Sequence, residues 1–280
     1  MLTFGVIYAI LSEASWLNFG ATCSVDLAQV QKGKPMQSPK WLEHLRKAET
    51  VYVLFSGGKD SSAALVYTKE LIEEFCESPR LVALHVDTTA GLPVVERFSE
   101  EFCAYIDVSL IVLKPKEDYF TLVKRWGVPR PRARWCCYYL KIEPIKRFLK
   151  EQENYVVLDG MRREESQKRS QYPPTYNHPH FGLVIHPIID WTSEQVEAFI
   201  ASRGLPINPA YDLGFSSWEC WCGVFKRKCE FEKLLEVDPD FFMKLVELEK
   251  SLRSGYAYAY FNGKPFYLRD LLNEDQNRGK

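Results

Sequence analysis

The sequence predicts an α/β fold, in which an open and mostly parallel sheet carries helices on both faces. From residue 50 onward, apolar runs of strand length alternate with segments of helical periodicity, which is the pattern of βαβ units. These runs are apolar at nearly every position, as expected for strands buried on both faces. We therefore expect an α/β domain over 50–204, preceded by an N-terminal extension (1–49) and followed by a Cys-rich, helical C-terminal region (205–280).

The individual elements follow from local signals. Pro93 opens a helix at a position where proline is tolerated, and Pro144 shifts the start of the next helix. Thr192 and Gln195 form a capping box, and Gly204 ends that helix. The expected strands are 50–56, 80–88, 108–115, 154–162 and 182–190, and the expected helices are 61–75, 93–105, 140–151 and 192–204. Further helix is expected over 230–254, broken at Pro239.

Composition limits the class of protein. The chain has 280 residues, of which 46% are hydrophobic and 26% charged, as in a globular protein with a proper core. The net charge of -1 suggests neither a nucleic-acid nor a membrane binder, although a local basic patch can hide inside a neutral total. No Lys or Arg precedes Lys32, which argues against a signal peptide, and no apolar run is long enough to span a bilayer.

The N-terminal extension has two interpretations. Its apolar start could form a helix packed on the core, or it could be an upstream segment with Met36 as an alternative start. Eight cysteines are too few for a disulfide scaffold in a chain of this length. We therefore expect a reducing, cytoplasmic setting, in which clustered cysteines more often mean metal or catalysis. A homo-oligomer is left open.

The motif "SGGKDSS", from Ser56 to Ser62, joins the first strand to the first helix. Ligands of open α/β sheets bind at the carboxyl ends of strands, where a helix N-terminus offers free N–H groups to an anion. Gly57 and Gly58 let the backbone approach the anion closely, and Lys59 adds a charge. The spacing is not that of the Walker A loop. The motif predicts a different phosphate-binding loop, with an ordinary strand-to-helix turn as the alternative.

Five cysteines form the second constellation of interest. Iron–sulfur clusters are usually held by four thiolates, zinc can also take four, and buried unligated thiols are the remaining alternative. The candidate ligands are Cys136, Cys137, Cys220, Cys222 and Cys229.

Two further groups are less specific. His178 and His180 could be metal ligands but are more typical of a surface loop, whereas His85 and His186 fall in strand runs and are expected in the core. A basic stretch could bind a polyanion such as RNA, close over nucleotide phosphates as a lid, or simply be solvated; it contains Lys124, Arg125, Arg130, Arg132 and Arg134.

Four segments in order carry a family resemblance: "SGGKDS", "LHVDTTAGLPVVERF", "RWCCYYLKIEPIKRFL" and "GMRREESQKR". The first resembles the pyrophosphate-binding loop of the adenine nucleotide alpha hydrolase superfamily. Together they resemble the phosphoadenosine phosphosulfate (PAPS) reductase family within it, over roughly residues 50–230. The resemblance implies a nucleotide-binding α/β domain that binds ATP with Mg²⁺. It also implies a [4Fe–4S] cluster, although "CWC" is one residue shorter than the usual C-x-x-C, which makes Cys229 the alternative for one ligand.

The resemblance also implies roles for residues at matched positions. Asp87 would lie near the nucleoside, with a strand-end cap as the alternative. Arg162 and Arg169 would bind an anion at the reacting end, oriented by Glu165 and Ser166, although "RREESQKR" could also be a solvated charge run. Lys141 would add charge beside the cysteine pair. The residues implied to hold the phosphates are Ser56, Gly57, Gly58, Lys59, Asp60 and Ser61, and Gly160 is placed in the same nucleotide site; Lys59, Lys141 and Arg162 are the catalytic candidates.

Three functions are compatible with these features. The intact S-G-G-K-D-S loop favours ATP-dependent adenylation, with attack on the α-phosphorus, release of pyrophosphate, and sulfur transfer to an acceptor such as RNA. Reduction of a sulfonucleotide to release sulfite is the second, but such reductases carry a nucleophilic cysteine near the C-terminus and here none follows Cys229. The third is a nucleotide- or cluster-binding subunit that is active only in a complex.

Overall fold

The structure is a computed structural model that describes residues 39–76, 79–215, 220–252 and 256–278. Expectations for residues 1–38, including Cys23 and Met36, lie outside the described residues. The strands are β1 (Thr50–Leu54), β2 (Arg80–Val86), β3 (Ser109–Leu113), β4 (Tyr155–Leu158), β5 (Thr175–His178), β6 (Gly182–Ile185), β7 (Ala259–Phe261) and β8 (Lys264–Phe266). The helices are α2 (Leu42–Lys47), α3 (Lys59–Phe75), α4 (Pro93–Tyr105), α5 (Tyr119–Trp126), α6 (Trp135–Cys137), α7 (Glu143–Leu149), α8 (Ser193–Ser202), α9 (Lys228–Val237), α10 (Pro239–Ser251) and α11 (Leu268–Arg278).

The main sheet has the order β3-β2-β1-β4-β6-β5. All its pairings are parallel except that of β5 with β6, which confirms the predicted α/β class. The chain moves outward from β1 through β2 to β3, and then returns to place β4 on the other side of β1. This reversal is the point at which open α/β sheets bind their ligands, beyond the carboxyl ends of the strands.

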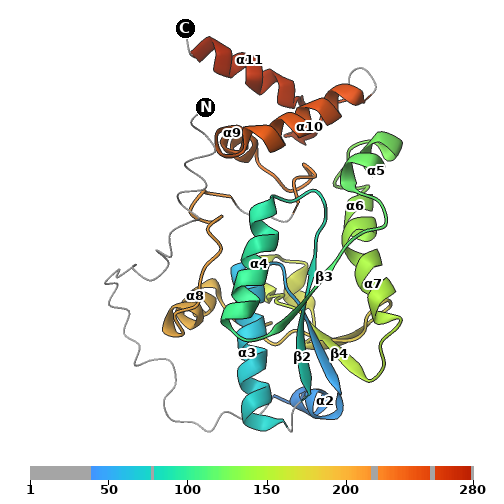
Figure 1. The fold of residues 1–280 in the computed structure, drawn as a ribbon, viewed down its shortest axis with the longest axis vertical. Helices are drawn as coiled ribbons and strands as arrows, with labels where there is room; N and C mark the ends of the chain where they lie inside the picture. Colours follow the sequence, from blue (N-terminus) through green and yellow to red (C-terminus); the bar gives the residue numbers. More distant parts are fainter. Residues whose placement is uncertain (1–38, 77–78, 216–219, 253–255, 279–280) are drawn as a thin grey trace. The chain divides into compact units, whose positions relative to one another are not determined.

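The two faces of the sheet are buried by different helices (Figure 1). Along β1, Val51 and Val53 enter one hydrophobic cluster while Tyr52 enters the other, because successive side chains of a strand point to opposite faces. The first face is covered by α2, α3, α4 and α8, and the second by α7, through Ile145 and Leu149. Burial on both faces explains why the strands are apolar at nearly every position.

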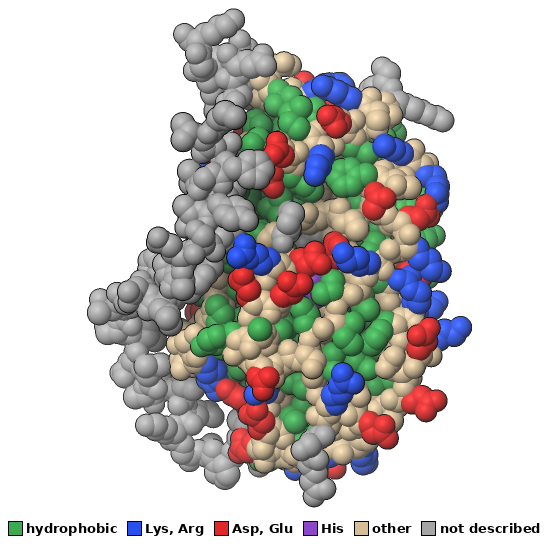
Figure 2. Space-filling view, in the orientation of Figure 1, with side chains coloured by type: hydrophobic (Ala, Val, Ile, Leu, Met, Phe, Trp, Pro, Cys, Tyr) green, Lys and Arg blue, Asp and Glu red, His purple; other side chains and the backbone are tan. Residues whose placement is uncertain are grey.

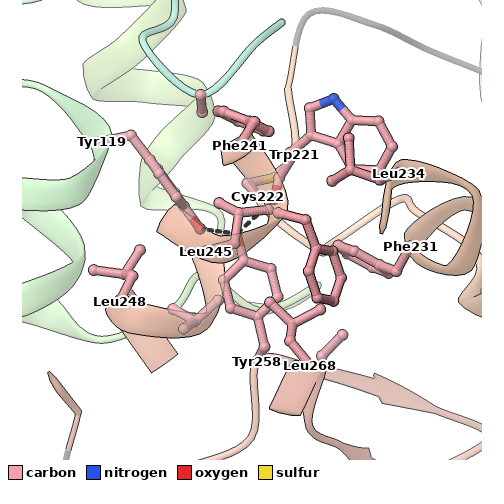
Figure 3. Close-up of a cluster of buried hydrophobic side chains, with 14 of the residues drawn as sticks. Tyr119, Trp221, Cys222, Phe231, Leu234, Phe241, Leu245, Leu248, Tyr258 and Leu268 are labelled. Carbon is pink, nitrogen blue, oxygen red and sulfur yellow. Dashed lines mark hydrogen bonds between the residues drawn. The ribbon is translucent and has the colours of Figure 1, made fainter. Parts of the chain in front are cut away.

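A second core joins the start of α4 and helix α5 to the C-terminal helices (Figure 3). Trp221 and Tyr258 are fully buried in it, and the Tyr258 hydroxyl donates to the Trp221 carbonyl oxygen at 2.6 Å. The Tyr119 and Tyr258 hydroxyls lie 3.0 Å apart. The Cys-rich segment after residue 219 is therefore fixed by aromatic packing and buried hydrogen bonds. Over the described ranges, no helix combines the length and apolarity needed to cross a membrane.

Several elements differ from the sequence prediction. The expected strand 182–190 ends at Ile185, although Ile188 and Ile189 are also buried. The apolar run therefore indicated burial correctly, but burial does not require strand conformation. The expected helix 140–151 is a π-helical turn (Tyr138–Ile142) followed by α7. The sequence prediction missed the helices α5 and α11 and the strands β5, β7 and β8, which are short or lack strong periodicity.

Candidate functional site

Buried side chains from other elements fix the backbone conformation of the loop between β1 and α3. Gly57 has φ of 72°, a region that favours glycine, and a Cβ there would lie 3.2 Å from the Ser99 hydroxyl. The buried Asn208 donates from Nδ2 to the Gly57 carbonyl oxygen at 3.0 Å. Because Asn208 binds this carbonyl oxygen, the conformation of the turn is fixed without a ligand.

The serines of the loop bond to each other and to its backbone. Ser61 Oγ donates to the Gly58 carbonyl oxygen at 2.8 Å and lies 3.1 Å from Ser56 Oγ. The Ser56 N–H in turn donates to Ser61 Oγ at 3.2 Å. The loop thus has a defined shape at the N-terminus of a 17-residue helix, where the helix dipole favours an anion.

Lys59 is anchored at its backbone and paired at its side chain. Its N–H donates to the Tyr211 hydroxyl at 3.1 Å, and its ammonium lies 2.6 Å from the Glu197 carboxylate of α8. Glu197 is well exposed, so this ion pair is weakly held. The Lys59 ammonium can therefore exchange Glu197 for a phosphate without a large cost.

A second loop, after β4, comes into backbone contact with the first. A Cβ on Gly160 would lie only 2.7 Å from the Asp60 carbonyl oxygen and 2.8 Å from the Ser61 nitrogen. No other residue type fits there without a shift of the backbone. Gly160 thus brings the ends of β1 and β4 together at the ligand-binding edge of the sheet.

Arg162 joins the same two loops through its side chain. It is 4% exposed, and its Nε donates to Asp60 at 2.7 Å. Its remaining donors bind the Glu164 carboxylate at 2.6 Å and the Ser193 hydroxyl and Trp191 carbonyl oxygen, each at 3.2 Å. Burial raises the pKa of Asp60, although Arg162 acts in the opposite direction. The Arg162 guanidinium is fully engaged with protein groups that stabilise the loop.

The rest of the arginine motif lies nearer to solvent. Glu165 accepts from the Arg162 N–H at 2.9 Å and forms an ion pair with the half-exposed Arg169. The Arg169 N–H donates to Ser166 Oγ at 3.3 Å. Of the two arginines predicted to bind an anion, Arg169 is the one whose guanidinium is open to solvent.

Asp87 lies at the end of β2, beside a cavity of about 170 Å³. It accepts from the Thr89 N–H at 2.8 Å and lies 3.3 Å from the exposed Lys114 ammonium. The cavity wall also contains His85, Thr88 and Glu96. Asp87 is thus both a cap for its own turn and a polar group in the wall of this cavity.

The sequence analysis did not find three groups that shape this edge: Asn208 and Tyr211, described above, and Asp159. The Asp159 carboxylate lies 2.6 Å from Nδ1 of His186, which is fully buried. Nε2 of that histidine has no hydrogen-bond partner among the described atoms. His186 was correctly expected in the core, but only the fold reveals its partner.

Four of the five candidate cysteines meet. The thiols lie near one another, because the pKa of Cys136 is shifted by Cys137 and Cys222, and that of Cys220 by Cys222. Cys136 and Cys222 are buried and the other two half-buried. The fifth, Cys229, is exposed on α9 and is not among the residues that shift the pKa of these four thiols. The C-x-C spacing is therefore compatible with a four-thiol group without Cys229.

Charged groups surround the four thiols. The neighbouring Cys136 thiol lowers the pKa of the Cys137 thiol to about 7, and Lys141 acts in the same direction. The buried Lys226 ammonium lies 4.1 Å from the Trp221 ring and 3.5 Å from Glu230. As their side chains lie, no three His, Cys, Asp or Glu residues among the described ranges have the geometry of a metal-ion site. The donor chemistry nevertheless fits a cluster or zinc, because both are held by four thiolates.

The thiol group is connected directly to the cavity wall. Trp221 lies between Cys220 and Cys222, and its backbone N–H donates to the Ala90 carbonyl oxygen at 2.7 Å. Ala90 lies in the same turn as Thr88, Thr89 and Gly91, which line the cavity. The Thr89 hydroxyl also accepts from the Tyr119 N–H at 2.8 Å. One turn after β2 therefore supports both the cavity and the cysteine segment.

Two solved structures are similar to this chain. A PAPS reductase from Candida auris covers 66% of this chain and 89% of its own, at 24% identity and a TM-score of 0.49. An FMN adenylyltransferase from Candida glabrata, solved with FMN and an ATP analogue, covers 78% of this chain and 72% of its own, at 16% identity and a TM-score of 0.51. At 16% identity, the similarity to the FMN adenylyltransferase supports the fold alone.

Curated relatives match at higher identity. An uncharacterized protein of Methanocaldococcus jannaschii is 31% identical over 204 residues, which are 72% of this chain and 47% of the relative. An adenosine 5'-phosphosulfate reductase of Deinococcus radiodurans is 36% identical over 86 residues, 31% of this chain and 33% of that enzyme. The chain thus spans less than half the length of these relatives. The family model of the phosphoadenosine phosphosulfate reductase domain matches residues 50–223. That match covers more than half of the chain and contains both the loop from Ser56 to Ser62 and the cysteine segment, and the chain therefore belongs to the PAPS reductase family.

Proposed function

We propose that the chain binds ATP at the carboxyl edge of the sheet and uses it to adenylate an acceptor, in a reaction linked to sulfur transfer. The observation that carries this proposal is the intact Ser56–Ser61 loop, preformed at the start of α3. A helix N-terminus with a fixed, glycine-containing loop and an adjacent lysine suits the pyrophosphate of ATP. In the proposed reaction an acceptor oxygen bonds to the α-phosphorus, the bond to the bridging α–β oxygen breaks, and pyrophosphate leaves with that electron pair.

The chain's own groups have distinct parts in this proposal. The loop amides and Lys59 bind the β- and γ-phosphates and stabilise the charge on the leaving pyrophosphate, with Mg²⁺ carried by ATP offsetting the rest. The cavity beside Asp87 takes the nucleoside. Arg162 and Gly160 act as positioning residues by holding the second loop against the first, whereas Arg169 remains a candidate contact for the acceptor or α-phosphate.

Cys136, Cys137, Cys220 and Cys222 are the proposed ligands of a [4Fe–4S] cluster, with zinc as the alternative. When bound, a cluster supplies thiolate-held iron for sulfur chemistry. The chain's contribution is to hold the four thiols beside the turn that lines the cavity, with Lys141 near Cys137. RNA and small sulfur acceptors are both compatible with this arrangement.

The test is conversion of α-labelled ATP to AMP and pyrophosphate by the anaerobically purified chain, with RNA and small-molecule acceptors. Lys59→Met should reduce turnover by at least ~100-fold, because a charge aimed at the leaving group is lost. Glu197→Gln is the matched control, since it removes the ion partner of Lys59 and keeps the ammonium; its turnover should be unchanged or higher. Equal turnover in wild type and Lys59→Met, or none in wild type with any acceptor, would overturn the proposal.

Sulfonucleotide reduction is the second candidate, favoured by the exposure of Cys229 outside the four-thiol group. The Cys229 thiolate would attack the sulfonate sulfur, the nucleotide would leave, and an external dithiol would then reduce the resulting cysteine thiosulfonate to release sulfite. Sulfite formation that disappears in Cys229→Ser would support this candidate and not the first. Nucleotide binding without either turnover would instead indicate a subunit that acts within a complex.

A further inference from the structure

A strongly basic segment surrounds the cysteine pair. Residues 119–142 contain six Lys and Arg and no Asp or Glu, in a chain whose net charge is -1. Arg132 and Arg134 are exposed, and neither forms an ion pair with any residue that the structure describes. Arg125, by contrast, is occupied by two hydrogen bonds with Glu117. Figure 2 shows Lys and Arg side chains gathered along the edge where Figure 1 places α5 to α7.

Exposed aromatic rings lie on the same segment. Eight large hydrophobic side chains are exposed among the described residues, and three of them form a continuous row. The Trp126 and Tyr139 rings lie 4.7 Å apart, and those of Tyr139 and Tyr138 lie 5.1 Å apart. These rings are 37–42% exposed, so each has a face or edge available to a partner.

Three more of the eight are placed beside arginines. Arg134 lies over the Phe225 ring at 5.4 Å, and Arg130 lies over the Tyr256 and Tyr260 rings at 5.2 and 4.4 Å. Arg130 also donates to the Ala257 and Tyr258 carbonyl oxygens at 2.8 and 3.3 Å. The turn from Arg130 to Ala133 is thus attached to the C-terminal region, which does not suit a lid that must move over the nucleotide.

Alternating cations and exposed rings are the chemistry that binds single-stranded nucleic acids. Bases stack on aromatic faces while Arg and Lys neutralise the phosphates, and a duplex, whose bases are already stacked, gains only the second interaction. We propose that the surface formed by Trp126, Arg132, Arg134, Tyr138 and Tyr139 binds a single-stranded nucleic acid. Because the half-buried Cys137 directly precedes Tyr138 in the chain, the bound strand would present a base near that thiol. That last step rests on the proposed function; binding itself does not.

The test is fluorescence anisotropy of a labelled single-stranded RNA of mixed sequence, titrated with the anaerobically purified chain in the absence of ATP. Tyr139→Ala should weaken binding about ten-fold, because one stacked base is lost. Tyr139→Phe should restore it, since the ring alone stacks. Tyr105→Ala is the matched control, because Tyr105 is equally aromatic, 62% exposed and placed on α4.

The arginines are tested through the salt dependence of binding. The double variant Arg132→Ala/Arg134→Ala should lower the slope of log K against log salt by about 1.4, from two lost phosphate contacts. The double variant Lys228→Ala/Lys233→Ala removes two exposed cations of α9 and should leave the slope unchanged. Circular dichroism and melting temperature identify any variant that fails to fold.

Several results would overturn the inference. These are no RNA binding by the wild-type chain, equal affinity for a matched duplex, or equal losses in the control variants. Weaker ATP binding in Arg132→Ala/Arg134→Ala with RNA affinity unchanged would show that the segment closes over the nucleotide. Because the titration contains no ATP, it can succeed when the turnover assay fails, and the reverse.

Discussion

Arg162 and Arg169 belong to one sequence motif, yet their surroundings call for different roles. Arg162 is 4% exposed and holds Asp60, whereas the Arg169 side chain is 43% exposed. A residue type that suits phosphate also suits a buried carboxylate. The motif alone could not show that Arg162 is buried and Arg169 exposed, because burial depends on which loop packs over each side chain.

Replacing the two arginines in turn tests this difference. Arg162→Ala should lower the free energy of unfolding by about 3 kcal/mol, because the half-buried Asp60 loses its ion partner. Arg169→Ala should cost less than about 1 kcal/mol, as is usual for exposed pairs. Urea titration followed by fluorescence measures both. Comparable losses of unfolding free energy in the two variants would show that Arg162 does not hold the two loops together.

Gly160→Ala tests the backbone contact between the same loops. The added methyl would meet the Asp60 carbonyl oxygen at 2.7 Å, so we expect a loss of about 2 kcal/mol of stability and weaker ATP binding. In Gly58→Ala the nearest atom is the Tyr211 hydroxyl at 3.3 Å, a side-chain end that can move. Thermal unfolding should therefore show a smaller loss for Gly58→Ala, and the opposite order would contradict the described packing.

At the scale of elements, α5 shows how a short helix can be set by its cap. Asp118 accepts from the Thr121 N–H at 2.9 Å and from its hydroxyl at 2.7 Å. Burial raises the pKa of Asp118, but these hydrogen bonds outweigh it and lower the pKa overall. A helix of eight residues is too short to be stable alone. It is also shorter than the window over which helical periodicity is recognised in a sequence, which is why it was not predicted.

Asp118→Ala should cost about 1 kcal/mol of stability at neutral pH, the usual value of an N-cap. Because the folded-state pKa is lowered, the carboxylate contributes fully above its unfolded pKa of about 4, and this contribution fades as the pH falls through the folded value. Wild type and Asp118→Ala should thus converge in melting temperature as the pH falls through and below this lowered folded-state pKa. Asp118→Asn, which keeps an acceptor, should lose less at neutral pH and show less pH dependence.

At the scale of the whole molecule, the thiol group joins two regions that lie about eighty residues apart in the sequence. Cys222→Ser should lower bound iron (or zinc) and also the melting temperature, because metal binding is coupled to folding. Cys229→Ser should retain both, since that thiol is exposed and outside the group. Metal and acid-labile sulfide analysis of anaerobic samples checks the prediction. Metal loss in Cys229→Ser alone would assign the ligand set differently.

The sequence by itself determined the α/β class, the order of most elements, the family, and the position of the phosphate loop. These properties depend on local periodicity and on short contiguous motifs, which the chain order alone reveals. The sequence also reduced the eight cysteines to five candidate ligands, but it could not choose among the five.

Only the tertiary structure decided which four thiols meet, that Arg162 is a buried joint, and that Asn208, Tyr211 and Asp159 support the ligand edge. It also decided that the exposed rings of Trp126, Tyr138 and Tyr139 form one row. The physical reason is the same in each case. Burial, ion pairing and thiol contact arise between segments that are distant in the chain, and no local pattern encodes which segments the core brings together.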